Sequence, residues 1–251
     1  MDMKEITGNR GIDWDHKCMF DALSEEFMEE YQSELNWEYV SMYQILSSDF
    51  IRKFHHKLDF NYIGGRNTTL SEDLIRALQD KLNWRLVSSY QALSESFIRE
   101  FKDKLSWYDI SSNIENEFSE DFIREFQYRL SIKHICRTQK LSEDFIREFH
   151  ETVSWGAVSL YQTLSEDFIR EFKHDVNWNY ICVNQKLSEN FIREFRDLVD
   201  WKNICEYQKL SKEFIIEFLD KVYFYHLIEN NRISNELKEE FQVMKELMGF
   251  K

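Results

Sequence analysis

A 23-residue segment recurs along almost the whole chain, and it constrains the fold more than any other feature. Its clearest copies read LSEDFIREFHETVSWGAVSLYQT (141–163) and LSENFIREFRDLVDWKNICEYQK (187–209). Copies open at Leu23, Leu46, Leu70, Leu93, Phe118, Leu141, Leu164, Leu187 and Leu210, and a shortened copy opens at Ile233. Tandem segments of this length form stacked arrays in which each repeat contacts mainly its neighbours.

The first half of the repeat predicts a short helix, here called helix A. Numbered from its opening residue, the repeat has Ser at position 2 in every copy, followed by acids such as Glu143 and Asp144. Serine caps a helix N-terminus, and acids favour the positive end of the helix dipole. Apolar residues at positions 5, 6, 9 and 13 then form one stripe, which predicts a core-facing helix over positions 3–13.

The second half predicts helix B over positions 15–22. Position 14 is usually Asn, Ser or Asp, which we interpret as a second cap. We expect Trp at position 15 and Val or Ile at position 18 to be buried, and the small residue at position 19 to let a neighbouring helix approach. Two short helices per repeat predict an all-α fold, an α-solenoid of about ten two-helix repeats.

The repeat boundaries predict the domain organisation. Residues 1–22 hold a half-repeat cap, because Trp14 lies nine residues before Leu23 as Trp37 does before Leu46. Residues 23–232 hold nine tandem repeats, and 233–251 form a C-terminal capping helix whose core positions turn charged. Extra residues near Gly64 and near Ile114 interrupt the period, and we expect them to change the curvature locally.

Composition narrows the possible functions. The net charge of −14 argues against general binding to nucleic acids, whose phosphates it repels. No run of about 18 apolar residues predicts a membrane span, and the N-terminus lacks the apolar core of a secretory signal. Cys136, Cys182 and Cys205 share position 19 with serines of other repeats, which predicts reduced thiols and an intracellular protein.

An arginine row at position 7 is the first candidate binding feature. An extended anionic partner fits such a row, but acids flank each arginine and allow ion pairing on a solvated face, for example to Asp80, Asp103 and Asp197 four residues later. The sequence leaves both interpretations open. The row comprises Arg52, Arg76, Arg99, Arg124, Arg147, Arg170 and Arg193.

A glutamine row at position 22 has two interpretations as well. Its amides are suited to a peptide backbone, or they satisfy unpaired carbonyls at the helix end within the array. The row comprises Gln44, Gln91, Gln139, Gln162, Gln185 and Gln208.

Positions 17 and 20 of helix B vary between repeats, which is expected of a recognition surface and also of neutral drift on a half-exposed face. Aromatic residues and Met are enriched at protein interfaces. The candidate partner-binding residues are Tyr39, Met42, Tyr62, Leu86, Leu160, Tyr180 and Val183.

Catalytic motifs are missing from the sequence. It holds no phosphate-binding glycine loop, no metal-ligand spacing and no nucleophile elbow, so we predict no catalytic residues, no cofactor and no metal. Repetition also argues against catalysis, which needs one singular group of residues.

The LSEDFIREF…W…I…YQK pattern resembles short repeats in proteins of giant amoeba-infecting DNA viruses, the Marseillevirus-like group in particular. The resemblance covers residues 23–231 and implies no catalytic or ligand-binding residues. It implies a viral protein that acts in the host cytoplasm or in the virion.

Three hypotheses follow. The first is a non-enzymatic scaffold that binds a viral or host protein along helix B. The second is nucleic-acid or polyanion binding through the arginine row, and the third is a structural component of the virion.

Overall fold

The chain is an α-solenoid built from two short helices per repeat. A computed structural model describes residues 12–248, with side chains described as far as residue 246. The ends of the predicted caps, residues 1–11 and 249–251, lie outside this range. The chain divides into two compact units, Met1–Ser131 and Ile132–Lys251, here called the N-terminal and C-terminal units. The division falls inside the fifth repeat, between its two helices.

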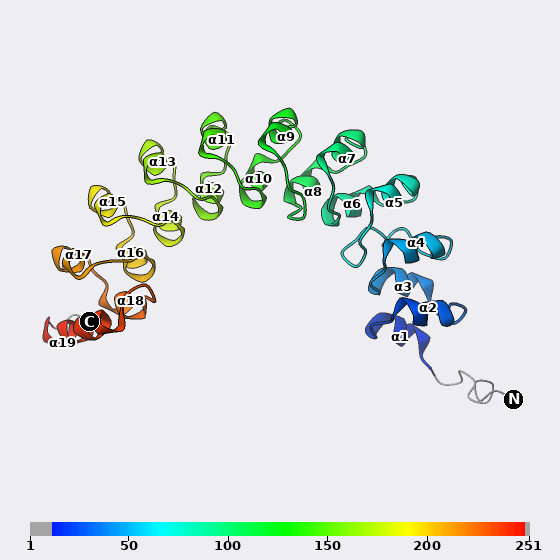
Figure 1. Cartoon of the computed structure of the whole chain (residues 1–251), viewed down its shortest axis with the longest axis horizontal. Coiled ribbons are helices and arrows are strands. Elements are labelled where there is room, and N and C mark those ends of the chain that lie inside the picture. Colours follow the sequence, from blue (N-terminus) through cyan, green and yellow to red (C-terminus); the bar gives the residue numbers. More distant parts are fainter. Residues whose placement is uncertain (1–11, 249–251) are drawn as a thin grey trace. The chain divides into compact units, whose positions relative to one another are not determined.

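Within each unit the helices A form one row and the helices B another (Figure 1). The N-terminal unit has helices A at α2 (Glu25–Glu30), α4 (Ser48–Phe54), α5 (Glu72–Ala77), α7 (Glu95–Glu100) and α9 (Glu120–Glu125). Its helices B are α1 (Trp14–Phe20), α3 (Trp37–Tyr43), α6 (Trp84–Tyr90) and α8 (Trp107–Ser112).

The C-terminal unit continues the pattern. Its helices A are α11 (Glu143–Glu148), α13 (Glu166–Glu171), α15 (Glu189–Glu194), α17 (Lys212–Glu217) and the longer α19 (Asn235–Met248). Its helices B are α10 (Ile132–Thr138), α12 (Trp155–Tyr161), α14 (Trp178–Asn184), α16 (Trp201–Tyr207) and α18 (Phe224–Glu229). Successive helices B of this unit pack directly on each other.

Serine capping begins every helix A, as predicted. The hydroxyl at position 2 accepts the backbone N–H at position 5, for example from Phe145 to Ser142 at 3.1 Å and from Phe168 to Ser165 at 3.1 Å. Even the shortened last repeat keeps this bond, between Leu237 and Ser234. The cap fixes where each helix starts and therefore sets the register of the array.

Helix A is shorter than predicted. It ends at position 8 in most repeats, and positions 9–12 form turns closed by bonds such as Thr152 N–H to Phe149 oxygen at 2.9 Å. The apolar stripe extends past the helix because Phe149 and Val153 still reach the core from these turns. Apolar periodicity therefore marked buried positions correctly and overestimated the helix length.

Tryptophan at position 15 is half-buried, not buried. Its ring lies over the phenylalanines of the next repeat, as Trp155 lies over Phe172 with ring centroids 4.8 Å apart. Its indole N–H donates to the main-chain oxygen at position 10, as from Trp155 to His150 at 3.2 Å. The polar nitrogen keeps one edge of the ring at the surface.

Position 19 is small for a reason beyond packing. Ser159 Oγ donates to the Trp155 oxygen at 2.7 Å and accepts the N–H of Asn177 in the next repeat at 2.9 Å. Cysteine takes the same place, and the Cys205 sulfur accepts the Tyr223 N–H at 3.4 Å. This side chain therefore hydrogen-bonds the start of the next helix B to its own repeat.

The second repeat lacks helix B, where the sequence predicted one. Two glycines fall in the expected helix, and Gly costs about 1 kcal/mol there relative to Ala. Gly64 adopts φ 96°, and residues 60–67 form turns. Thr68 closes the segment by accepting the Gly64 N–H at 2.8 Å and by forming a parallel bridge with Leu46.

Candidate interaction surfaces

The arginine row lies on helix A, where ion pairs bind it into the array. Arg147 Nε donates to Glu171 of the next repeat at 2.8 Å, and its other nitrogens lie 2.9 Å from Asp144 and 3.6 Å from Glu143. The guanidinium also lies 5.0 Å from the centroid of the Phe168 ring. This one side chain therefore contacts three carboxylates and an aromatic face.

The same arrangement recurs along both units. Arg76, Arg99, Arg170 and Arg193 each bind the glutamate at position 8 of the following repeat at 2.8–2.9 Å. Hydrogen bonds to these glutamates raise the pKa of Arg76, Arg99, Arg147 and Arg170. Arg124 pairs with Glu120 and Asp121 in its own helix.

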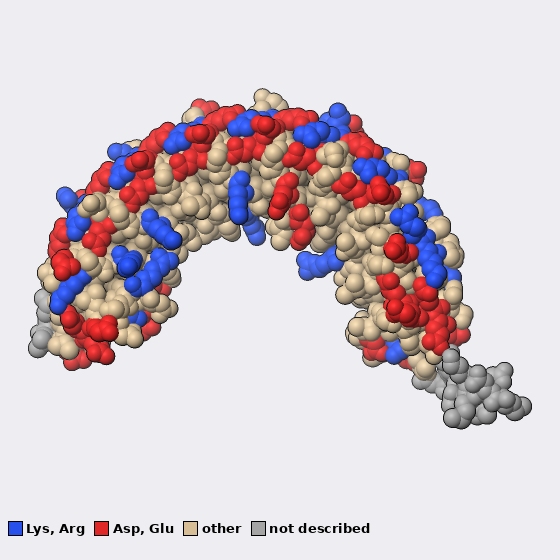
Figure 2. All heavy atoms as spheres, viewed as in Figure 1, with Lys and Arg blue, Asp and Glu red and all other residues tan. Residues whose placement is uncertain are grey.

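Part of the predicted ion pairing is confirmed: Glu143 and Asp144, one turn before Arg147, pair with it. The predicted pairs with acids four residues after an arginine are not formed among the described residues. The arginines bind acids one turn before them and in the next repeat, whereas Asp80, Asp103 and Asp197 pair with Lys104, Arg129 and Lys221. Arg52, the first in the row, forms no ion pair with the described residues. Each paired arginine contacts more carboxylates than it can neutralise, so this edge stays acidic overall (Figure 2).

The glutamine row forms an internal clamp. Gln162 Nε2 donates to the main-chain oxygens of Cys136 and Gln139 at 2.7 and 2.8 Å, and its Oε1 accepts the Leu141 N–H at 2.9 Å. Gln44, Gln91, Gln185 and Gln208 make equivalent bonds. These bonds satisfy main-chain groups at the end of the preceding helix B. The glutamine side chains are buried, so they are not accessible to a partner.

In the fourth repeat two asparagines share the role of one glutamine. Asn113 Nδ2 donates to the oxygens of Ser88 and Gln91, whereas Asn116 Oδ1 accepts the Leu93 N–H at 2.9 Å. The inserted residues near Ile114 therefore preserve the clamp with a longer turn.

The candidate partner-binding residues lie along helix B and are only partly exposed. Tyr39 and Met42 lie on α3 and Leu86 on α6 of the N-terminal unit, and all three are half-buried. In the C-terminal unit Leu160 on α12 and Val183 on α14 are half-buried, and Tyr180 on α14 is exposed. Tyr62 lies in the turns that replace the missing helix, so its predicted helical position is wrong.

A more exposed aromatic row at position 21 escaped the sequence analysis. Phe20, Tyr43, Tyr90 and Tyr161 occupy the last residue of their helices with 71%, 45%, 41% and 50% of their surface exposed. The repeat alignment contained the signal, because an aromatic residue recurs there. Variation between repeats does not identify this row, because position 21 is partly constant.

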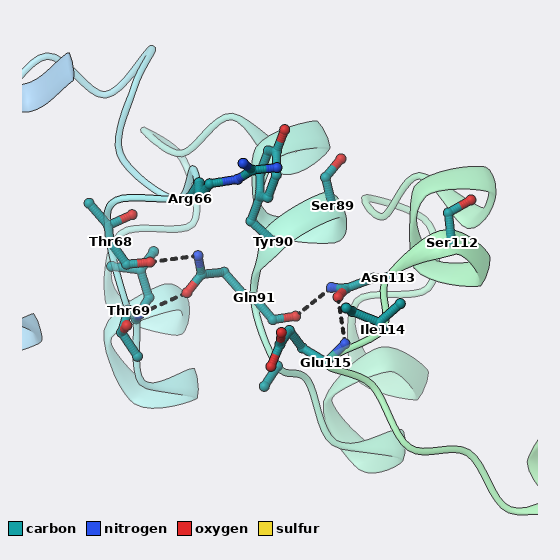
Figure 3. A pocket seen from close by; sticks show the side chains of 12 residues that line it. Arg66, Thr68, Thr69, Ser89, Tyr90, Gln91, Ser112, Asn113, Ile114 and Glu115 are labelled. Carbon is teal, nitrogen blue, oxygen red and sulfur yellow. Dashed lines mark hydrogen bonds between the residues drawn. The ribbon is translucent and has the colours of Figure 1, made fainter. Parts of the chain in front are cut away.

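Both insertions of the N-terminal unit border one groove. The groove holds about 600 Å³ and lies between residues 66–70, the end of α6 and the turn after α8 (Figure 3). The Arg66 guanidinium lies over the Tyr90 ring, 5.8 Å from its centroid, and Ser89, Ser112 and Glu115 also line the space. Buried Gln91 and Asn113 form its floor through hydrogen bonds to the backbone.

The titratable groups give no sign of an activated nucleophile. All four cysteines are free and buried, and burial raises the pKa of Cys182 to about 12 and that of Cys205 to about 11. Among residues 12–248, no three His, Cys, Asp or Glu side chains are grouped as metal ligands. In the same range, no helix combines the length and hydropathy that crossing a membrane requires.

Comparison of the chain with models of protein families, with curated proteins and with solved structures finds no match.

Proposed function

We propose that the protein is a non-enzymatic scaffold that binds another protein along the helix-B edges of its units. The observation that carries this proposal is the row of exposed aromatic side chains at position 21. Single exposed aromatic residues are common, but aromatic residues are enriched at protein interfaces, and several of them along one edge are typical of an interaction surface. The half-buried Tyr39, Met42, Leu86 and Leu160 lie on the same helices, and Val183 lies on α14; all add apolar area.

The helix-A edge offers fewer free side chains to a partner than the helix-B edge. Along helix A, the arginines and glutamates are engaged with each other, and the serines cap the helices. The nucleic-acid hypothesis for the arginine row stays a prediction, and the ion pairs give these arginines a role within the array.

The resemblance to repeats of Marseillevirus-like viruses extends the proposal. The partner is then a viral or host protein, and the protein acts in the host cytoplasm or in the virion. If the protein is instead a structural component of the virion, it is still a scaffold, but its partners include further copies of the chain.

Selection of displayed peptides on the immobilised full chain tests the proposal. We expect peptides to be enriched over blank beads, and their binding to fall when Tyr43, Tyr90 and Tyr161 are all changed to serine. Tyr128→Ser is the matched control, because Tyr128 is 95% exposed in the turns after α9, away from helix B. Failure to enrich peptides, or unchanged binding to the triple variant, contradicts the proposal.

A further inference from the structure

A row of cations lies on the helix-B edge of the C-terminal unit. At positions 16, 17, 20, 21 and 23 of its repeats, the described residues include seven lysines and arginines and two glutamates. All seven are exposed; they are Lys133, Arg137, Lys140, Lys186, Lys202, Lys209 and Arg232, here called the cationic edge. The same positions in the N-terminal unit hold two arginines and four acids.

These cations differ from the arginine row in forming no close ion pairs, although Lys202 lies near enough to Glu206 to help lower the pKa of that carboxyl. None of the seven forms an ion pair with the described residues, whereas the paired arginines on helix A, such as Arg170, contact two or three carboxylates. One glutamate of this edge, Glu206, is bound to His226 at 2.8 Å. Blue side chains therefore gather on this side of the unit, away from the red and blue edge of helix A (Figure 2).

A structural role does not account for the cationic edge. A cation near a helix C-terminus gains about 0.3–1 kcal/mol from the helix dipole. That benefit is available in every repeat, but position 23 holds Ala22, Ile45, Ala92 and Glu115 in the N-terminal unit. At the same position the C-terminal unit has Thr163 in one repeat and a cation in the others, namely Lys140, Lys186, Lys209 and Arg232. The charge is therefore specific to one unit.

Exposed aromatic residues lie among these cations. Tyr161, Tyr180 and Tyr225 are 50%, 39% and 63% exposed, and the Arg137 guanidinium lies 5.9 Å from the centroid of the Tyr161 ring. Aromatic and cationic side chains together favour a partner with carboxylates and some apolar surface.

We propose that the cationic edge binds an acidic, extended polypeptide segment. Packed helices lie about 8–10 Å apart, and an extended chain rises about 3.3 Å per residue. A carboxylate at about every third residue therefore meets the cations at position 23 of three successive repeats, Lys186, Lys209 and Arg232. This inference rests on the proposed function and specifies the chemistry of its partner.

A polypeptide fits better than nucleic acid. Double-stranded DNA carries about one charge per 1.7 Å, and a chain of net charge −14 repels so dense an array of phosphates. One cation row at a spacing of about 8–10 Å neutralises few phosphates but matches the sparser carboxylates of a protein segment.

The test compares two charge-reversed variants of the full chain. Lys186→Glu/Lys209→Glu removes cations from the cationic edge. Lys173→Glu/Arg196→Glu makes the same charge change in the same unit, in the turns after helices A. A displayed library of random peptides of about 15 residues is selected on the unaltered chain, a length that spans about five repeats.

We expect the selected peptides to be rich in Asp and Glu. Their binding should fall about tenfold or more with Lys186→Glu/Lys209→Glu, fall only slightly with the control variant, and weaken as salt is raised. Circular dichroism of both variants checks that the fold is kept.

Four results overturn the inference. Enriched peptides that lack acids, or that bind Lys186→Glu/Lys209→Glu unchanged, leave the scaffold function standing and contradict the acidic partner. A labelled oligothymidylate that binds the chain and is lost with the same variant assigns the edge to phosphates. Self-association in sedimentation that disappears with this variant assigns it to a second copy of the chain. Failure to enrich any peptide contradicts the proposed function itself.

Discussion

Arg147 of α11 donates a hydrogen bond to Glu171 of α13 at 2.8 Å, so one repeat holds the next through a charged pair on the solvent side. Helix A of each repeat is followed by turns, and side chains such as these connect successive helices of the row. The pair is about one-third and one-half exposed, so solvent screens it.

A double-mutant cycle measures this link. We expect Arg147→Ala and Glu171→Ala to show a coupling of about 0.5–1 kcal/mol in urea unfolding, because exposed pairs are worth little. Arg147→Ala alone should lower the free energy of unfolding more than Arg52→Ala does, since Arg52 has no ion pair among the described residues. Equal effects of the two single substitutions would show that the pair contributes nothing to stability.

The glutamine clamp should contribute far more to the free energy of unfolding than the Arg147–Glu171 pair. Gln162→Ala leaves two main-chain oxygens and the Leu141 N–H without their partner in a buried turn. An unsatisfied buried group costs about 1–3 kcal/mol, so we expect a loss of about 3 kcal/mol or more in the free energy of unfolding.

Exposed glutamine is the control for this experiment. Gln32→Ala removes an amide on the surface and should change stability by less than about 0.5 kcal/mol. Gln162→Asn should be intermediate, since Asn113 shows that a shorter amide keeps the two donated bonds. A loss for Gln162→Ala as small as for Gln32→Ala would mean that the clamp is dispensable.

The sequence predicted the recurring parts of the fold and missed the parts that depend on neighbouring repeats. Ser142 and its equivalents were identified as caps because capping is local in sequence. The role of Ser159 was missed because its second partner, Asn177, lies 18 residues away in the next repeat. Helix A was overextended because Phe149 is buried whether its backbone is helical or in a turn.

The candidate surface, too, was predicted only where the signal is local in the sequence. Variation between repeats pointed to helix B, but the burial of Leu86 and Leu160 depends on packing that the period does not specify. The exposed row at Tyr43, Tyr90 and Tyr161 becomes visible only when solvent exposure is known. Likewise, the seven cations of the cationic edge stand out only once the ion pairs of the other cations are assigned.

Buried thiols should make the protein less stable at alkaline pH. The pKa of Cys182 and Cys205 is about 12 and about 11 in the fold, against 9.0 ordinarily, because burial disfavours the thiolate. The folded state thus holds these protons more tightly than the unfolded state. Their contribution is fully present below pH about 9 and is lost as the pH rises towards 11–12.

Serine is the matched replacement at these two positions. Ser159 and Ser88 occupy the same place in other repeats and accept the equivalent N–H. Cys182→Ser/Cys205→Ser should therefore keep the fold and reduce the fall in the urea midpoint between pH 8 and pH 10. An identical fall in the variant would assign the alkaline loss to other groups, such as the tyrosines.

Two glycines allow a paired test of the backbone. Gly64 has φ 96°, and a Cβ there would lie 3.2 Å from Val87 Cγ2, so Gly64→Ala strains the turn that replaces helix B of the second repeat. We expect a loss of about 1–3 kcal/mol in the free energy of unfolding. Gly156 lies in α12, and a Cβ added there would meet no atom within 4 Å, so Gly156→Ala should stabilise the protein by about 0.5–1 kcal/mol. If Gly64→Ala raises the urea midpoint as Gly156→Ala does, the left-handed turn at Gly64 is not required, and the second repeat can form the helix that the other repeats have.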